Sequence, residues 1–365
     1  MLYLLSVALL ATLSLWTVKA DHCPICLAHF HGRSAAPVVV KTQCCGQLFD
    51  LDCISKSFVG QPIGSRQCAM CRQDPMPVVN QNTNESHPDT FFPDQRFYLA
   101  CSIGDLGQVE RSVAEGVNVN AVMTNGLTAL MLASRWRHAE VAERLINSGA
   151  NVNTAWHGDG TTSLFLAAMN GFTDCVKILI NAGADLDIPR TSDGATPLFA
   201  AAMRGNTDCV KLLINAGADL NAGADLSAGA DLNARTKTDT TPLFAAAQEN
   251  NTDCVKLLIN AGADINIPRT WDGSTPLLAA AVKGNTDCLE LLINAEADLN
   301  AQTEDGLTAL FMAAQQNNIN CVKLLIKAGA NLNIPRISDG ITSLSIAIAM
   351  GNTECALALI KAGAK

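Results

Sequence analysis

The chain has 365 residues, a formal net charge of −9 at neutral pH and a sequence pI near 5.1. An acidic chain of this kind lacks the basic face that nucleic-acid binding requires, so we exclude nucleic acid as a partner. Aromatic residues make up only 5% of the sequence, which suits thin helical layers better than one deep globular core.

The N-terminal segment, 1–20, has the composition of a membrane-targeting sequence. The stretch from Leu2 to Val18 is almost entirely apolar, and Val18 and Ala20 place small residues at the −3 and −1 positions of a signal-peptidase site. This predicts cleavage after Ala20 and export through a secretory route. The alternative is an uncleaved membrane anchor, and because the nearest basic residues follow the segment, an anchor would leave the body of the protein cytosolic.

Seven of the 14 cysteines lie in the next segment, between Cys23 and Cys71. Two C-x2-C knuckles flank a central cysteine cluster, and a knuckle lets two thiolates grip one tetrahedral zinc ion. About 50 residues with few apolar side chains need such a metal staple to fold. An odd number of cysteines, two of them adjacent, fits disulfides poorly. The sequence therefore predicts a zinc-stabilised module over 21–75.

The order of these cysteines resembles a divergent, C3HC4-like member of the RING family, over about one seventh of the chain. The resemblance implies two zinc ions with interleaved ligand pairs. One ion would be held by Cys23, Cys26, Asp50 and Cys53, and the other by the Cys44/Cys45 pair with Cys68 and Cys71. Asp50 stands where Cys or His is usual; a carboxylate can ligate zinc, and a plain surface carboxylate is the alternative.

RING domains of the ligase type position a ubiquitin-charged conjugating enzyme, which is catalysis by orientation. The resemblance assigns contacts with that enzyme to Ile25 and Phe58 and a bracing contact with ubiquitin to Arg72, although Phe58 falls one place beyond the usual Trp and Ala69 replaces the usual Pro. A zinc module that only folds or binds a partner remains the alternative.

From Gln73 onward the composition turns to Pro, Asn, Gln, Ser and Thr, which predicts a flexible linker over 76–95. Beyond it, similar segments containing Thr-Pro-Leu, Ala-Ala, Gly-Asn and Gly-Ala-Asp-Leu-Asn recur with a period of about 33 residues, and they resemble the ankyrin repeat family. The resemblance implies a mostly α-helical solenoid of about eight repeats over 96–365, beginning its first helices after Thr128, Thr162, Thr196, Thr241, Thr275, Thr308 and Thr342.

The residue types predict where the helices of one repeat begin and end. Thr196 caps a helix whose first turn accommodates Pro197. Cys209 belongs to the apolar face of the second helix. Because its counterparts recur once per repeat, too far apart for disulfides, we expect them to be small buried apolar residues. Gly217 ends that helix in the left-handed conformation. Glu296 occupies the position that glycine holds in the sibling repeats.

One repeat is longer than its siblings, because the hexapeptide Ala-Gly-Ala-Asp-Leu-Asn is copied twice more and the two added copies form an insertion near 222–233. Three of the loops between repeats, the fingers, carry Ile-Pro-Arg, beginning at Ile188, Ile267 and Ile334. Apart from the insertion, these fingers recur at every second repeat. This pattern indicates that the array grew by duplicating pairs of repeats.

The family resemblance implies that a protein partner binds the concave face made by the fingers and first helices. Arg and Trp carry much of the binding energy at protein interfaces, so their finger positions are candidates; the alternative is that the arginines are solvated residues inherited by copying. No catalytic constellation is present. The candidate partner-binding residues are Trp156, Arg190, Arg235, Arg269, Trp271 and Arg336.

Two functions are consistent with this organisation. In the first, the zinc module recruits a ubiquitin-conjugating enzyme and the array selects the substrate, as in a RING-type ubiquitin ligase. In the second, the chain is a non-enzymatic exported or membrane-tethered scaffold with a structural zinc module. Because ubiquitin chemistry is cytosolic, the fate of the N-terminal segment 1–20 discriminates between them.

Overall fold

A computed structural model of the chain describes residues 39–42, 48–50, 78–80, 86–87, 94–123, 125–216 and 229–365. These residues fall into two compact parts. The first part runs to Ala129 and includes Ser148–Ala150, and the second comprises Leu130–Asn147 and Asn151–Lys365.

The first part contains a small antiparallel sheet in the order β2-β1-β3-β4. Strands β3 and β4 lie within the segment for which the sequence predicts a flexible linker. The β-branched pair Val78 and Val79 explains why β3 forms there, since such residues favour strands. The strands are β1 (Val39–Thr42), β2 (Leu48–Asp50), β3 (Val78–Asn80) and β4 (Ser86–His87).

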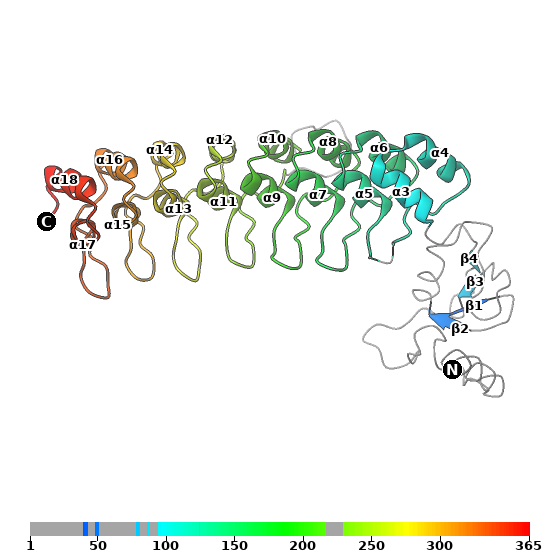
Figure 1. Cartoon of the computed structure of the whole chain (residues 1–365), viewed down its shortest axis with the longest axis horizontal. Helices are drawn as coiled ribbons and strands as arrows, with labels where there is room; N and C mark the ends of the chain where they lie inside the picture. Colours follow the sequence, from blue (N-terminus) through cyan, green and yellow to red (C-terminus); the bar gives the residue numbers. More distant parts are fainter. Residues whose placement is uncertain are drawn as a thin grey trace, which may run out of the picture. The chain divides into compact units, whose positions relative to one another are not determined.

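All the described helices form consecutive antiparallel pairs, one pair to a repeat, and there are eight such pairs in the described residues, as the sequence predicts (Figure 1). The pairs are α3 (Gln95–Ile103) with α4 (Leu106–Ala114), α5 (Ala129–Arg135) with α6 (Ala139–Asn147), α7 (Ser163–Met169) with α8 (Thr173–Asn181), α9 (Pro197–Arg204) with α10 (Thr207–Asn215), α11 (Pro242–Gln248) with α12 (Thr252–Asn260), α13 (Pro276–Lys283) with α14 (Thr286–Asn294), α15 (Ala309–Gln315) with α16 (Ile319–Lys327), and α17 (Ser343–Ala349) with α18 (Thr353–Lys361).

In the second part the pairs stack in a row and form two layers (Figure 1). The first helix of each pair, here called the inner helix, packs on the inner helices of its neighbours, and the second, the outer helix, packs on outer helices. The fingers extend from the side of the inner helices. Any one repeat is too thin to bury its own apolar face, so each depends on its neighbours for a core.

The predicted threonine caps are confirmed in the array. The Thr196 hydroxyl accepts a hydrogen bond from the Phe199 amide at 3.3 Å, and Pro197 occupies the first turn, where no amide donor is needed. The same cap begins five other inner helices, at Thr162, Thr241, Thr275, Thr308 and Thr342.

The predicted burial of the repeating cysteines is also confirmed. Cys175, Cys209, Cys254, Cys288, Cys321 and Cys355 are free thiols with at most 1% of their surface exposed. Burial raises the pKa of the Cys175 thiol to about 11, so it stays protonated at neutral pH. These residues therefore act as small apolar core groups.

An asparagine at the start of five outer helices, from α10 to α18, joins neighbouring repeats. The Asn285 side chain does not cap its own helix, α14. Its amide instead donates to the carbonyl oxygens of Ala247 at 2.8 Å and Gln248 at 2.9 Å, at the end of α11 in the preceding repeat. The last carbonyls of a helix have no partner within the helix, so this contact satisfies them. The same contact is made by Asn206, Asn251, Asn318 and Asn352.

Backbone hydrogen bonds also join four pairs of successive fingers. The amide of Thr191 donates to the Asp159 carbonyl at 2.6 Å, and the amide of Lys237 donates to the Asp193 carbonyl at 2.7 Å. Equivalent bonds join Glu304 to Asp272 and Ile337 to Asp305. The fingers are therefore held in register rather than projecting as independent loops.

The hydrogen bonds around the long repeat show how it accommodates its insertion. In a sibling, the Ala184 amide donates to the Leu179 carbonyl, which belongs to the last turn of the outer helix. In the long repeat the equivalent bond runs from Ala230 to Leu213, at 3.2 Å. The 12 additional residues therefore fall between Leu213 and Ala230 in the sequence, and residues 229–233 occupy the regular repeat position, so the predicted bounds of the insertion, near 222–233, lie too far along the chain.

The predicted left-handed position at Glu296 is confirmed, with φ at 64°. The Glu296 amide bonds to Ile293, as the amide of its glycine sibling Gly262 bonds to Ile259. The two repeats thus end their outer helices in the same way. The left-handed backbone is strained only at Glu296, because glycine has no side chain.

We predict that Glu296→Gly stabilises the protein by about 1 kcal/mol, because glycine adopts this conformation without steric cost and the negative charge at a helix C-terminus is removed. The midpoint of a urea unfolding transition should rise. The matched control is Gly262→Ala, where an added Cβ meets no atom within 4 Å, so that only the backbone cost remains and the midpoint should fall. A lower midpoint for Glu296→Gly would contradict the account.

Candidate protein-binding face

The finger face is defined here as the surface formed by the fingers and the last turns of the inner helices in the second part of the structure. Four of the predicted partner-binding residues, Trp156, Arg190, Arg269 and Arg336, begin their fingers at equivalent positions, because each amide bonds to the backbone five residues later, as from Arg190 to Ala195. Arg235 stands one place earlier in its finger. Its position corresponds to that of Pro268 in the finger of Arg269.

Three of the arginines are clasped by an aspartate of the same finger. The Arg190 Nε donates to Asp193 Oδ1 at 3.0 Å, and its Nη2 donates to Oδ2, so both oxygens are used. The hydrogen bond from Arg190 lowers the pKa of Asp193 below its ordinary value of 3.8. The same fork joins Arg269 to Asp272 and Arg336 to Asp339.

Each clasped guanidinium also lies over a phenylalanine of the inner helix that precedes its finger in the chain. Arg190 lies 4.8 Å from the ring centre of Phe165, Arg269 lies 4.7 Å from that of Phe244, and Arg336 lies 5.6 Å from that of Phe311. An arginine so placed gains a cation–π contact as well as its fork. These contacts tie each finger to the repeat before it.

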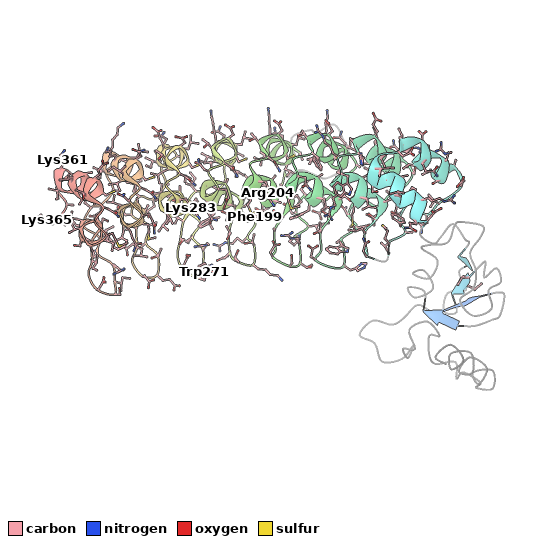
Figure 2. The ribbon with its side chains drawn as sticks, in the orientation of Figure 1. Phe199, Arg204, Trp271, Lys283, Lys361 and Lys365 are labelled. Atoms are coloured by element: carbon pink, nitrogen blue, oxygen red, sulfur yellow. The ribbon has the colours of Figure 1, made fainter. Side chains whose placement is uncertain are left out.

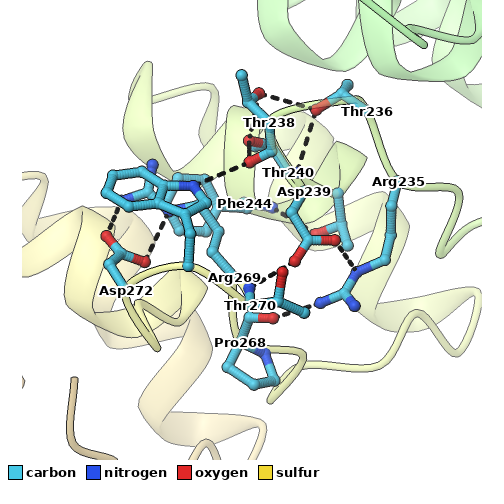
Figure 3. A network of polar contacts seen from close by, with 12 residues as sticks. Arg235, Thr236, Thr238, Asp239, Thr240, Phe244, Pro268, Arg269, Thr270 and Asp272 are labelled. Atoms are coloured by element: carbon cyan, nitrogen blue, oxygen red, sulfur yellow. Dashed lines mark hydrogen bonds and ion pairs between the residues drawn. The ribbon is translucent and has the colours of Figure 1, made fainter. Parts of the chain in front are cut away.

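Arg235 is held by its own finger and by the neighbouring one. Its Nε lies 3.0 Å from Asp239, and its Nη2 donates to the Pro268 carbonyl (Figure 3). Asp239 in turn accepts a hydrogen bond from the Thr270 amide. This network joins the two fingers that begin near Arg235 and Arg269.

The arginine row therefore has an internal role that the sequence prediction did not assign. All four guanidinium groups have carboxylate partners within their own fingers. The aspartates and phenylalanines that hold them were missed, although the recurring Arg-x-x-Asp spacing was a usable signal. Trp156 is expected near a finger tip, but it lies at the start of its finger and is half-buried.

Trp271 is the most exposed of the predicted partner-binding residues. Its side chain is 60% exposed, one ring face lies 4.5 Å from the Arg269 guanidinium, and its indole N–H donates to the Thr238 carbonyl at 3.3 Å. Arg269 thus contacts two aromatic rings, those of Phe244 and Trp271, while forked to Asp272. The ring is fixed in place while much of its surface remains open.

A pocket of about 420 Å³ lies on the finger face beside Trp271. Its floor is apolar and comes from three consecutive inner helices, through Phe244, Leu278 and Met312. Its rim carries Lys283 from the last turn of α13 and Glu304 and Asp305 from a finger tip; Figure 2 shows Trp271 among the fingers and Lys283 on the inner-helix layer. The sequence analysis identified Trp271 and Arg269 but missed the rest.

The predicted zinc ligands Cys23, Cys26, Cys44, Cys45, Cys53, Cys68 and Cys71 lie outside the described residues, as do Ile25, Phe58, Arg72 and the segment 1–20. Asp50 is described only as the end of β2. Within the described part of the chain, no group of three or more acidic, histidine or cysteine residues could hold a metal ion. No helix there is long and apolar enough to cross a membrane.

The fold and its finger face define a helical repeat protein. A family model described as "Ankyrin repeats (3 copies)" matches residues 97–190, 149–224, 223–303 and 295–365, and the chain belongs to the ankyrin repeat family. No curated protein sequence matches the chain significantly. Ankyrin repeats support protein–protein interaction, which confirms the general binding role predicted from the sequence.

Proposed function

We propose that the chain selects a protein partner through its finger face. The observation that carries this proposal is the pocket beside Trp271, where an apolar floor is surrounded by charged groups on three rigidly joined repeats. Interfaces gain most from fixed aromatic anchors next to apolar pockets, because little conformational entropy remains to be lost on binding. The hydrogen bonds between neighbouring fingers supply that rigidity.

The face is tested by charge reversal at two exposed residues of inner helices, Arg204 and Lys283 (Figure 2). We predict that the full chain carrying Arg204→Glu and Lys283→Glu captures at least tenfold less of the proteins that the wild type captures from cell extract. The matched control reverses two exposed lysines of outer helices, Lys211 and Lys256, and should retain them. Equal loss in both variants, or in neither, would contradict binding at the finger face.

We further propose that the N-terminal part of the chain binds two zinc ions and recruits a ubiquitin-conjugating enzyme, so that the array selects a substrate for ubiquitination. The supporting observation is the sequence order of two C-x2-C knuckles around Cys44, Cys45 and Cys53, with Ile25 inside the first knuckle and Arg72 after the last. This function requires a cytosolic body, as an uncleaved membrane anchor at the N-terminus would give. A structural zinc module on an exported scaffold is the competing proposal.

The two proposals are separated by autoubiquitination of the full chain with a panel of conjugating enzymes. If the ligase function holds, Ile25→Ala and Arg72→Ala should each reduce the activity at least tenfold while the zinc content stays at about two ions per chain. Wild-type inactivity across the panel with zinc bound would favour the structural module. Absence of zinc would overturn both.

A further inference from the structure

The pocket beside Trp271 differs from the equivalent places in the sibling fingers. The other two fingers with Ile-Pro-Arg carry Ser192 and Ser338 where this finger carries Trp271. In an array that grew by duplication, a residue present in every copy can simply be inherited. A residue found in only one copy reflects a change at that repeat. The serines also show that the finger backbone forms without the indole.

The charges around the pocket do not balance. The Arg269 guanidinium forms a bidentate ion pair with the Asp272 carboxylate, so the pair contributes no net charge. The rim then has one exposed cation, Lys283, against two exposed carboxylates, Glu304 and Asp305, at the adjoining finger tip. A partner group entering beside that finger tip meets a negative potential.

The exposed surface of Trp271 also favours a positively charged group. An indole face attracts a cation within about 6 Å of its centre more strongly than any other side-chain ring does. One face is already used in this way by Arg269, at 4.5 Å, and 60% of the side chain remains exposed. The hydrogen bond to the Thr238 carbonyl holds the ring in place before any partner arrives.

We infer that this pocket takes a basic segment of a partner protein, in which an arginine or lysine stacks on Trp271 beside Glu304 and Asp305 and a neighbouring apolar side chain enters the floor over Leu278 and Met312. This inference rests on the proposed binding role of the finger face and adds to it the chemistry of the partner. Lys283, at the helix side of the rim, donates to a backbone carbonyl or a carboxylate of the same segment.

The test is selection of a phage-displayed library of random dodecapeptides on the full chain, followed by titration of the enriched peptides as synthetic molecules. The expected peptides share an arginine or lysine next to a large apolar residue. Trp271→Ser, the residue of the sibling fingers, should weaken their binding about tenfold or more. Raising the salt concentration should weaken binding by the wild type, because exposed charges are screened.

Two further variants make the outcome specific. Trp136→Ser removes another exposed tryptophan, which lies in the turn after α5 and outside the pocket, and should leave peptide binding unchanged. The double variant Glu304→Lys and Asp305→Lys should abolish binding of the basic peptides and select acidic ones instead. Enriched peptides that lack a basic residue, or that bind Trp271→Ser as tightly as the wild type, would overturn the inference and leave the binding role intact. Failure to enrich any peptide would overturn the binding role itself.

Discussion

The array depends on a hydrogen bond that the last five repeats each supply to the repeat before. The last carbonyls of a short inner helix have no partner within the helix, and the following repeat supplies a donor through an asparagine side chain, as Asn285 does for Ala247 and Gln248 at 2.8 and 2.9 Å. Because a buried carbonyl without a partner costs about 1–3 kcal/mol, a repeat without its successor is incomplete. Stability in such an array is therefore shared between neighbours.

The same dependence shapes the finger face. Inner helices fixed side by side place the fingers close enough to exchange backbone hydrogen bonds, and the arginine clasps then anchor the fingers to the phenylalanines beneath them. The arginines thus serve the face by positioning it. Trp271 contacts one of these clasps from above, so the surface offered to a partner is built on contacts made within the protein.

Much of the array could be predicted from single residues, because its rules are local. A threonine followed by proline starts a helix, a glycine after the helix ends it, and the departure at Glu296 was visible against its copies. The asparagine contacts and the Arg–Phe contacts could not be predicted in this way, since they join residues far apart in the chain and depend on how repeats stack. The pocket needs side chains from three repeats and was beyond a residue-by-residue interpretation.

Hydrogen exchange on the full chain carrying Asn285→Ala tests the dependence between repeats most directly. The Asn285 side chain does not cap its own helix but donates backward, to the end of α11. We therefore expect faster exchange in α11, in the repeat before the substitution, than in wild type. Asn294→Ala, at an exposed position in the same repeat as Asn285, should not have this effect. Faster exchange confined to α13 and α14, with α11 unchanged, would contradict the account.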